Sequence, residues 1–160
     1  MARVNPLTRV AIVIGRQRWL PRFLPQIVWL DRAMHRLSRG RVTLLTLARL
    51  PQLYLTVRGR KSGEPRTTPL LYVPHRGAYL VAGSNWGAPE LPVWVLNLRD
   101  ARTAEVDVKG GRTEVTPRQV EGGERTELWQ VMIRTWPNYA KYAERTDREI
   151  PVFVLTPVSG

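Results

Sequence analysis

The pattern of apolar and polar residues changes near residue 50. Before that point, apolar residues recur at helical spacing among basic ones, which predicts an amphipathic helix. The residues that set this spacing are Ile27, Leu30, Met34 and Leu37. After that point, short apolar runs alternate with polar residues at the period of β-strands, between turns rich in glycine and proline. We therefore expect a basic helical leader over residues 1–50 and a β domain over residues 51–160.

The second part is expected to form short strands with few helices. The strands are predicted at residues 53–58, 67–73, 79–83, 103–108, 112–120 and 151–155. Helices are predicted just after Pro92, at residues 123–134 and at residues 138–145. Strands and helices do not alternate, so the order favours an antiparallel β-barrel of the α+β class with peripheral helices.

The composition restricts the chemistry that side chains alone could perform. The chain has no cysteine, which excludes disulfides, thiolate metal sites and a cysteine nucleophile. With only two histidines, His35 and His75, we expect neither a histidine metal site nor a catalytic triad. If the protein is an enzyme, its chemistry is therefore expected to come from a bound organic cofactor.

The positive charge is concentrated in the first two-fifths of the chain. The formal net charge is +12, and residues 1–66 hold 14 Lys and Arg but only two acids, Asp31 and Glu64. The remaining residues carry 11 charges of each sign. An anionic partner is expected to meet this basic region. A nucleic acid is not expected, because the basic residues are not interleaved with aromatic ones and no known nucleic-acid motif occurs.

The sequence of the leader indicates where in the cell we expect the protein. No apolar run approaches the roughly 18–20 residues of a membrane span. Arg16 and Arg18 stand where a signal peptide would have small residues, so we expect a cytoplasmic protein. A basic amphipathic helix could also lie peripherally on the anionic inner face of the cell membrane. The alternative is a helix packed across the barrel, with its arginines in solvent.

Three segments of the β domain could form a site. In the first, RGRKSGEPR, two glycines let the backbone turn tightly, while Ser62 and four cations could hold a phosphate. The cations are Arg58, Arg60, Lys61 and Arg66. The segment lacks the residue order of a P-loop, and the alternative is an ordinary solvated turn.

The other two segments are rich in aromatic residues. SNWGAP, followed by Trp94 and Asn97, could wall a flat ring and bond its heteroatoms, or could be a turn with a core tryptophan. In WPNYAKY, Tyr139 and Tyr142 share a helix face. They could line a substrate pocket and donate a proton, or they could cap the barrel.

In order and spacing, the segments resemble the deazaflavin-dependent nitroreductase family, whose members use coenzyme F(420). The resemblance covers about residues 51–157 and rests on GRKSGEPRTTPLLYV, GSNWGAPELPVWVLNL and LWQVMIRTWPNYAKYAERTDREIPVFVL. It implies a split antiparallel β-barrel like those of FMN-binding and pyridoxamine-phosphate-oxidase-like proteins. It also implies an oxidoreductase that transfers a hydride from the reduced coenzyme to an electrophilic small molecule, such as a quinone, an enone or a nitro compound.

The resemblance also implies which residues form the site. The phosphate of the anionic coenzyme would be held by Arg60, Lys61, Ser62 and Arg66, with Asn97 on the same side. The ring would lie along the backbone of Thr67, Thr68, Pro69 and Leu70. A second loop would contact the coenzyme through Ser84, Asn85, Trp86, Gly87 and Ala88. The catalytic candidates on the substrate side are Tyr139, Tyr142 and Ser84.

Three positions depart from the nitroreductases of this family. Asn85 stands where those members have lysine, and Leu71 and Trp136 stand where they have tyrosine. Nitroreductase activity is therefore not implied. Two alternatives stay open at this point: a non-catalytic carrier of the coenzyme, and a barrel that binds FMN instead. The oligomeric state is not predicted.

Overall fold

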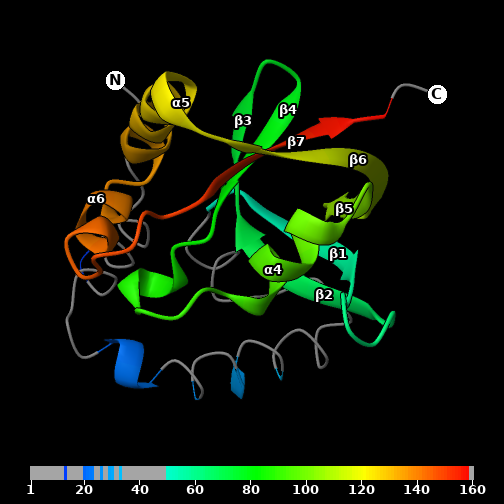
Figure 1. The fold of residues 1–160 in the computed structure, drawn as a ribbon, viewed down its shortest axis with the longest axis horizontal. Helices are drawn as coiled ribbons and strands as arrows, with labels where there is room; N and C mark the ends of the chain where they lie inside the picture. The colour runs from blue at the N-terminus through cyan, green and yellow to red at the C-terminus, as the bar shows by residue number, and fades with distance from the viewer. Residues whose placement is uncertain are drawn as a thin grey trace. The chain divides into compact units, whose positions relative to one another are not determined.

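The computed structural model describes residues 13, 20–23, 26, 29, 30, 33 and 50–158 (Figure 1). Contacts divide the chain into two units, Met1–Pro51 and Gln52–Gly160. In the first unit, η1 (Leu20–Phe23) is a short 3-10 helix, and Leu30 is helical. The predicted leader helix falls largely outside the described residues, Ile27, Met34 and Leu37 included.

The second unit is built on one seven-stranded sheet in which every neighbouring pair is antiparallel. The strand order is β2-β1-β5-β6-β7-β4-β3. The strands are β1 (Gln52–Arg58), β2 (Pro65–Leu71), β3 (Val73–His75), β4 (Ala78–Ala82), β5 (Ala104–Val108), β6 (Gly111–Val120) and β7 (Val152–Pro157). Strand β6 pairs with β5 through its first half and with β7 through its second, and the sheet curls around the core (Figure 1). The predicted α+β class and split antiparallel β-barrel are confirmed.

The strands between residues 65 and 75 differ in their bounds from the predicted strand. One strand was expected at residues 67–73, but β2 already begins at Pro65, and Tyr72 separates it from β3. A proline is tolerated at the start of β2 because this strand lies at the edge of the sheet, where half of the N–H groups need no partner strand. Consequently the sheet has one strand more than predicted.

The core lies on one face of the sheet. Along β1, Leu53, Leu55 and Val57 are buried and alternate with half-buried residues, which is the pattern of a strand with one face covered. Helix α4 (Val93–Asp100) begins directly after Pro92, as predicted, and buries Trp94, Val95 and Leu98 against this face. Each fully buried apolar side chain of this size stabilises the fold by about 1.5–3 kcal/mol.

Two further helices follow β6. Helix α5 (Gly122–Thr135) covers the helix predicted at residues 123–134, and its buried residues are Leu128, Trp129 and Met132. It is followed by the short helix α6 (Asn138–Ala143), and Figure 1 shows the two in contact at one end of the sheet. A short 3-10 helix, η2 (Asn85–Gly87), lies against α6. Among the described residues, no helix combines the length and the apolar character that a membrane span requires.

Candidate functional site

The loop between β1 and β2 is closed by its own hydrogen bonds. We call residues 59–64 the basic loop. The N–H of Gly59 donates to the Glu64 carbonyl at 2.8 Å, and the N–H of Gly63 donates to the Gly59 carbonyl at 2.7 Å. A Cβ on Gly59 would lie only 2.6 Å from Oγ of Ser62, which accepts a hydrogen bond from the Glu64 N–H. Glycine at position 59 therefore allows the hydroxyl to sit inside the turn.

The cations around the basic loop are exposed and not neutralised. Arg58 donates to the Gly63 carbonyl at 3.0 Å and so supports the turn. Within residues 50–158, the side chains of Arg60, Lys61 and Arg66 form no ion pair. A cluster of unpaired cations next to backbone N–H groups suits an anionic group such as a phosphate.

Asn97 ties the basic loop to helix α4. Its side chain is buried, and its Oδ1 accepts a hydrogen bond from the Arg60 N–H at 3.2 Å. The geometry therefore gives Asn97 a defined local task, which is to fix the backbone of a residue predicted to hold the phosphate.

Strand β2 offers its backbone to a ligand. Thr67, Thr68, Pro69 and Leu70 all lie on this strand, which forms one edge of the sheet. Because β2 has β1 on one side only, every second residue directs its N–H and C=O away from the sheet. The Thr67 hydroxyl lies 2.8 Å from that of Thr56 on β1.

The second predicted loop has an unusual backbone. We call residues 83–88 the tryptophan loop. Asn85 and Trp86 have φ angles of 45° and 58°, in the left-handed region that side chains other than glycine rarely adopt. Such residues cost on the order of 1–3 kcal/mol each and persist only where the surroundings hold them. The Asn85 amide donates to the Glu90 carbonyl at 3.0 Å, so this side chain is used within the loop region itself.

Two arginines that the sequence reasoning missed hold the tryptophan loop. Arg148 donates to three carbonyls, those of Gly83, Ser84 and Ala88. Arg145 donates to the Trp86 carbonyl at 3.2 Å. Burial lowers the pKa of Arg148, and the negative charge of Glu90 opposes that shift. Both arginines follow α6 in a segment with no recognisable pattern, so the sequence contains no local signal for this role.

The predicted tyrosines are buried. Tyr139 is 3% exposed, and its ring contacts those of Trp129 and Tyr142, with centroids 5.5 and 6.1 Å away. Burial raises the pKa of Tyr139 well above its ordinary value of 10.0, and Tyr142 raises it further. Burial also raises the pKa of Tyr142, while its hydrogen bond with Trp136 opposes the shift. Both phenols therefore stay neutral at physiological pH.

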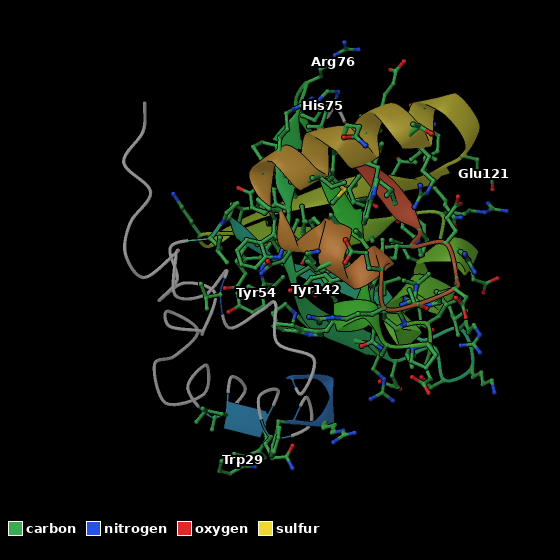
Figure 2. All side chains as sticks on the ribbon, turned by 90° about the vertical axis from the view of Figure 1, so that its left-hand side faces the viewer. Trp29, Tyr54, His75, Arg76, Glu121 and Tyr142 are labelled. Atoms are coloured by element: carbon green, nitrogen blue, oxygen red, sulfur yellow. The ribbon has the colours of Figure 1, made fainter. Side chains whose placement is uncertain are left out.

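The three predicted segments come together in the fold. Asn97 of α4 accepts the hydrogen bond from the basic loop. Val95, on the same helix, packs against the tryptophan loop: a Cβ added to Gly83 would lie 2.6 Å from the Val95 side chain. The tryptophan loop in turn contacts α6, because the rings of Trp86 and Tyr142 lie 6.0 Å apart between centroids. Figure 2 labels Tyr142 on this helix. A chain of contacts through the buried residues Asn97, Val95 and Tyr142 therefore connects the three segments.

The part of the chain that the structure describes shows no candidate metal site. It contains no group of three or more histidine, cysteine or acidic residues placed to hold an ion. His75 lies at the tip of the β3–β4 hairpin (Figure 2).

Comparisons with known proteins agree on one family. The sequence profile described as F(420)H(2)-dependent quinone reductase matches residues 29–157. The chain is 37% identical over 143 residues to a Mycobacterium tuberculosis protein named as an F(420)H(2)-dependent quinone reductase, covering 87% of this chain and 96% of that protein.

Solved structures lead to the same group. One described as an F(420)-H2 dependent reductase is 36% identical, has a TM-score of 0.61 and covers 66% of this chain and 93% of its own. Another, described as a domain-swapped dimer, is 31% identical with a TM-score of 0.63, over 80% of this chain and 97% of its own. A haem storage protein from Vibrio cholerae, at 12% identity, a TM-score of 0.53 and coverage of 69% of this chain and 83% of its own, shares the fold alone.

Proposed function

The chain belongs to the F(420)H(2)-dependent quinone reductase family, and from this premise we propose that it binds reduced coenzyme F(420) across its two loops and reduces a quinone. It is an oxidoreductase, so the alternative of a non-catalytic carrier is set aside. The predicted cofactor and reaction class follow from the same membership. The roles of individual residues are our proposal.

The basic loop would hold the phosphate of the coenzyme. Arg60, Lys61 and Arg66 supply positive charge that no acid of residues 50–158 neutralises by an ion pair. Ser62 accepts from the Glu64 N–H, which leaves its own hydroxyl proton free to be donated. The residues present therefore fit an anionic group.

The flat ring would lie between the edge of β2 and the tryptophan loop. Of Thr67, Thr68, Pro69 and Leu70, every second residue directs its backbone outward, so this edge would offer carbonyl acceptors, and N–H donors except at Pro69, to a pyrimidine-like ring edge. Trp86 is half-buried, so it offers aromatic surface to such a ring. Ala88 is half-buried and would bring the backbone close to the ring without a bulky side chain, and Gly87 lets the loop pack against α6.

The reaction requires a hydride and a proton, because a quinone becomes a quinol when it takes up both. The reduced coenzyme, when bound, supplies the hydride from a carbon of its deazaflavin ring. The protein orients the two partners and excludes water between them.

Ser84 is the predicted catalytic group best suited to contact the substrate. It is half-buried, and its hydroxyl forms no hydrogen bond with any residue of the described part of the chain. Tyr139 and Tyr142 stay candidates for the substrate side. Because both are buried and burial raises the pKa of both, we propose that they support the substrate side by packing, Tyr142 against Trp86 and Tyr139 against Tyr142, and that they donate no proton. The proton would then reach the quinone oxygen through the Ser84 hydroxyl and solvent.

The observation that carries this arrangement is the hydrogen bond from the Arg60 N–H to the Asn97 side chain. It links the exposed cations to the helix on which the tryptophan loop also packs. The proposed partners of the phosphate and of the ring would thus lie on two loops that contact the same helix, α4.

Titration with oxidised coenzyme F(420) tests this arrangement. Lys61→Ala and Arg66→Ala should each weaken binding by about 1–3 kcal/mol, the range for lost charge-assisted hydrogen bonds. Arg134→Ala is the matched control, because Arg134 is an exposed cation in the last turn of α5 and belongs to neither loop. Unchanged affinity in both variants would remove the phosphate role of the basic loop and of Arg66 beside it.

Two parallel measurements define the cofactor and the substrates. Binding of FMN at equal or higher affinity than coenzyme F(420) would favour the FMN alternative. Oxidation rates of the reduced coenzyme with quinones, enones and nitro compounds would define the acceptors. We expect quinones to react and nitroimidazoles to react poorly, because the Asn85 amide is engaged with the Glu90 carbonyl and Trp136 is buried.

We further propose that the leader contacts an anionic membrane surface from the cytoplasmic side. Trp29 is 71% exposed and Leu30 is 46% exposed, and both are helical. Apolar residues of this kind beside the arginines of the leader are the features that interfacial helices use. The binding experiment is given in the Discussion.

A further inference from the structure

We propose that Arg148 is the positioning residue that fixes the tryptophan loop in its coenzyme-binding shape. This role rests on the function proposed above, because the shape matters only if that loop meets the coenzyme. Arg148 itself contacts the loop backbone and is not among the groups proposed to touch the coenzyme or the substrate.

The guanidinium spans the whole loop. Its Nη1 donates to the Gly83 carbonyl at 3.0 Å and its Nη2 to the Ser84 carbonyl at 3.0 Å. Its Nε donates to the Ala88 carbonyl at 3.2 Å. All three nitrogens are therefore used, and together they tie the first residues of the loop to its last.

The loop needs such a restraint. Asn85 and Trp86, between the tied ends, hold left-handed backbone angles that they would leave if the ends could separate. The internal hydrogen bonds of the turn are few: the Gly87 N–H donates to the Ser84 carbonyl and the Ala88 N–H to the Asn85 carbonyl. Arg145 donates to the Trp86 carbonyl itself, so the placement of Trp86, the proposed ring wall, depends on Arg148 for the two ends of the loop and on Arg145 in between.

Arg148 is itself well supported. Its N–H donates to the Thr146 hydroxyl at 3.4 Å. On its other side, Arg125 of α5 donates to the Ile150 carbonyl at 2.8 Å and pairs with Glu149 at 3.4 Å. A residue whose backbone is held on both sides can impose a geometry on its partner.

Arginine is specifically suited to this position. Its planar fork presents donors in fixed directions, whereas lysine has a single ammonium at the end of a flexible chain. Arg148→Lys keeps the charge and removes the fork. The substitution therefore separates positioning from simple electrostatic attraction.

The experiment compares Arg148→Lys and Arg148→Met with Arg134→Lys and Arg134→Met in the full chain. Two quantities are measured: amide hydrogen exchange without ligand, and the dissociation constant of oxidised coenzyme F(420). For both Arg148 variants we expect exchange at Gly87 and Ala88 to accelerate about tenfold or more and affinity to fall about tenfold, which corresponds to loss of about one charged hydrogen bond. Amides of β1 and β5 should keep their protection, and the Arg134 variants should match the wild type.

A chemical rescue makes the assignment stricter. In Arg148→Ala, added methylguanidinium at concentrations that do not denature the protein should restore part of the coenzyme affinity. In Arg134→Ala it should have no effect. A residue that merely fills space would not be replaced by a free guanidinium ion.

Each outcome decides the proposal. Wild-type affinity in the Arg148 variants, or unchanged exchange at Gly87 and Ala88, would overturn it. Faster exchange spread equally over β1 and β5 would make Arg148 a general stabilising residue and would overturn it as well. If the wild type binds no coenzyme, the proposed function fails, while exchange in the free protein still decides whether Arg148 holds the loop.

Discussion

Tyr139 shows how burial limits what a residue can do. A phenol on a helix beside a predicted site is an obvious proton donor from sequence. In the fold its ring is enclosed by Trp129 and Tyr142, and desolvation raises its pKa. A group with a raised pKa holds its proton more tightly, so it makes a poor general acid at neutral pH.

The same shift predicts how stability depends on alkaline pH. The unfolded chain ionises Tyr139 near pH 10, while the folded protein keeps it neutral to higher pH, so the unfolded state binds fewer protons in this window. Stability is therefore unaffected below pH 10 and falls above it, by about 1.4 kcal/mol per pH unit for one such group. Urea unfolding between pH 9 and pH 11 should show a shallower decline in Tyr139→Phe. Equal declines in both proteins would mean that Tyr139 ionises normally.

Gly87 allows the tryptophan loop to meet α6. Its φ is +82°, and a Cβ there would lie 2.7 Å from the Tyr142 carbonyl and 2.8 Å from Cβ of Arg145. Gly87→Ala should destabilise the protein by about 1–3 kcal/mol from overpacking, in addition to roughly 1–2 kcal/mol from backbone strain. Urea denaturation measures the sum.

Gly110 provides the control for that substitution. Its φ is +87°, but nothing lies within 4 Å of an added Cβ. Gly110→Ala should therefore show the strain alone. If the two variants were equally destabilised, the contacts of the added Cβ at position 87 with Tyr142 and Arg145 would contribute nothing to the loss of stability.

At the scale of elements, α4 connects the parts of the site. Asn97→Ala removes the acceptor of the Arg60 N–H and should weaken coenzyme binding by about 0.5–1.5 kcal/mol, because the basic loop loses its tie to the helix. Gln119→Ala is a suitable control, since it removes another polar contact of α4, the 2.8 Å bond from Arg99, away from the loop. Titration of both variants with the coenzyme compares the two contacts. Similar affinities for the two would show that the tie is unimportant.

Elements with local patterns were predictable from sequence, and elements fixed by distant contacts were not. Alternation in Leu53–Val57 located β1, and Pro92 located the start of α4. The break at Tyr72 was missed, because residues on both sides of it favour strands. The roles of the Arg148 contacts were also missed: their acceptors are backbone carbonyls about 60 residues away, which any sequence would offer.

The candidate site shows the same division. The basic loop was found from its charges and glycines. Asn97 was noted with the second segment, but its place on the phosphate side came only from the family resemblance, since a lone asparagine in a helix has no distinctive pattern. Its interaction with Arg60 spans 37 positions of sequence. The residues proposed to touch the coenzyme were therefore easier to predict than those that hold them in place.

At the scale of the whole molecule, the uneven charge motivates a membrane experiment. Trp29→Ser with Leu30→Ser should reduce sedimentation with vesicles of anionic phosphatidylglycerol about tenfold or more, because burial of apolar area adds to the attraction of the basic leader. Val158→Ser is the control, since Val158 is 45% exposed but lies outside the leader. Neutral phosphatidylcholine vesicles should bind little in every case. Equal sedimentation of all variants with anionic vesicles would contradict the proposal.

The position of β7 has a consequence for biosynthesis. This strand is synthesised after the other six, yet it lies between β6 and β4, so the β3–β4 hairpin joins the rest of the sheet only through it. While the polypeptide is still emerging from the ribosome, that hairpin and the second half of β6 therefore lack a neighbour. Their open edges are then available to wrong partners, including other nascent chains. Chaperone demand during translation is thus expected to end when residues 152–157 emerge.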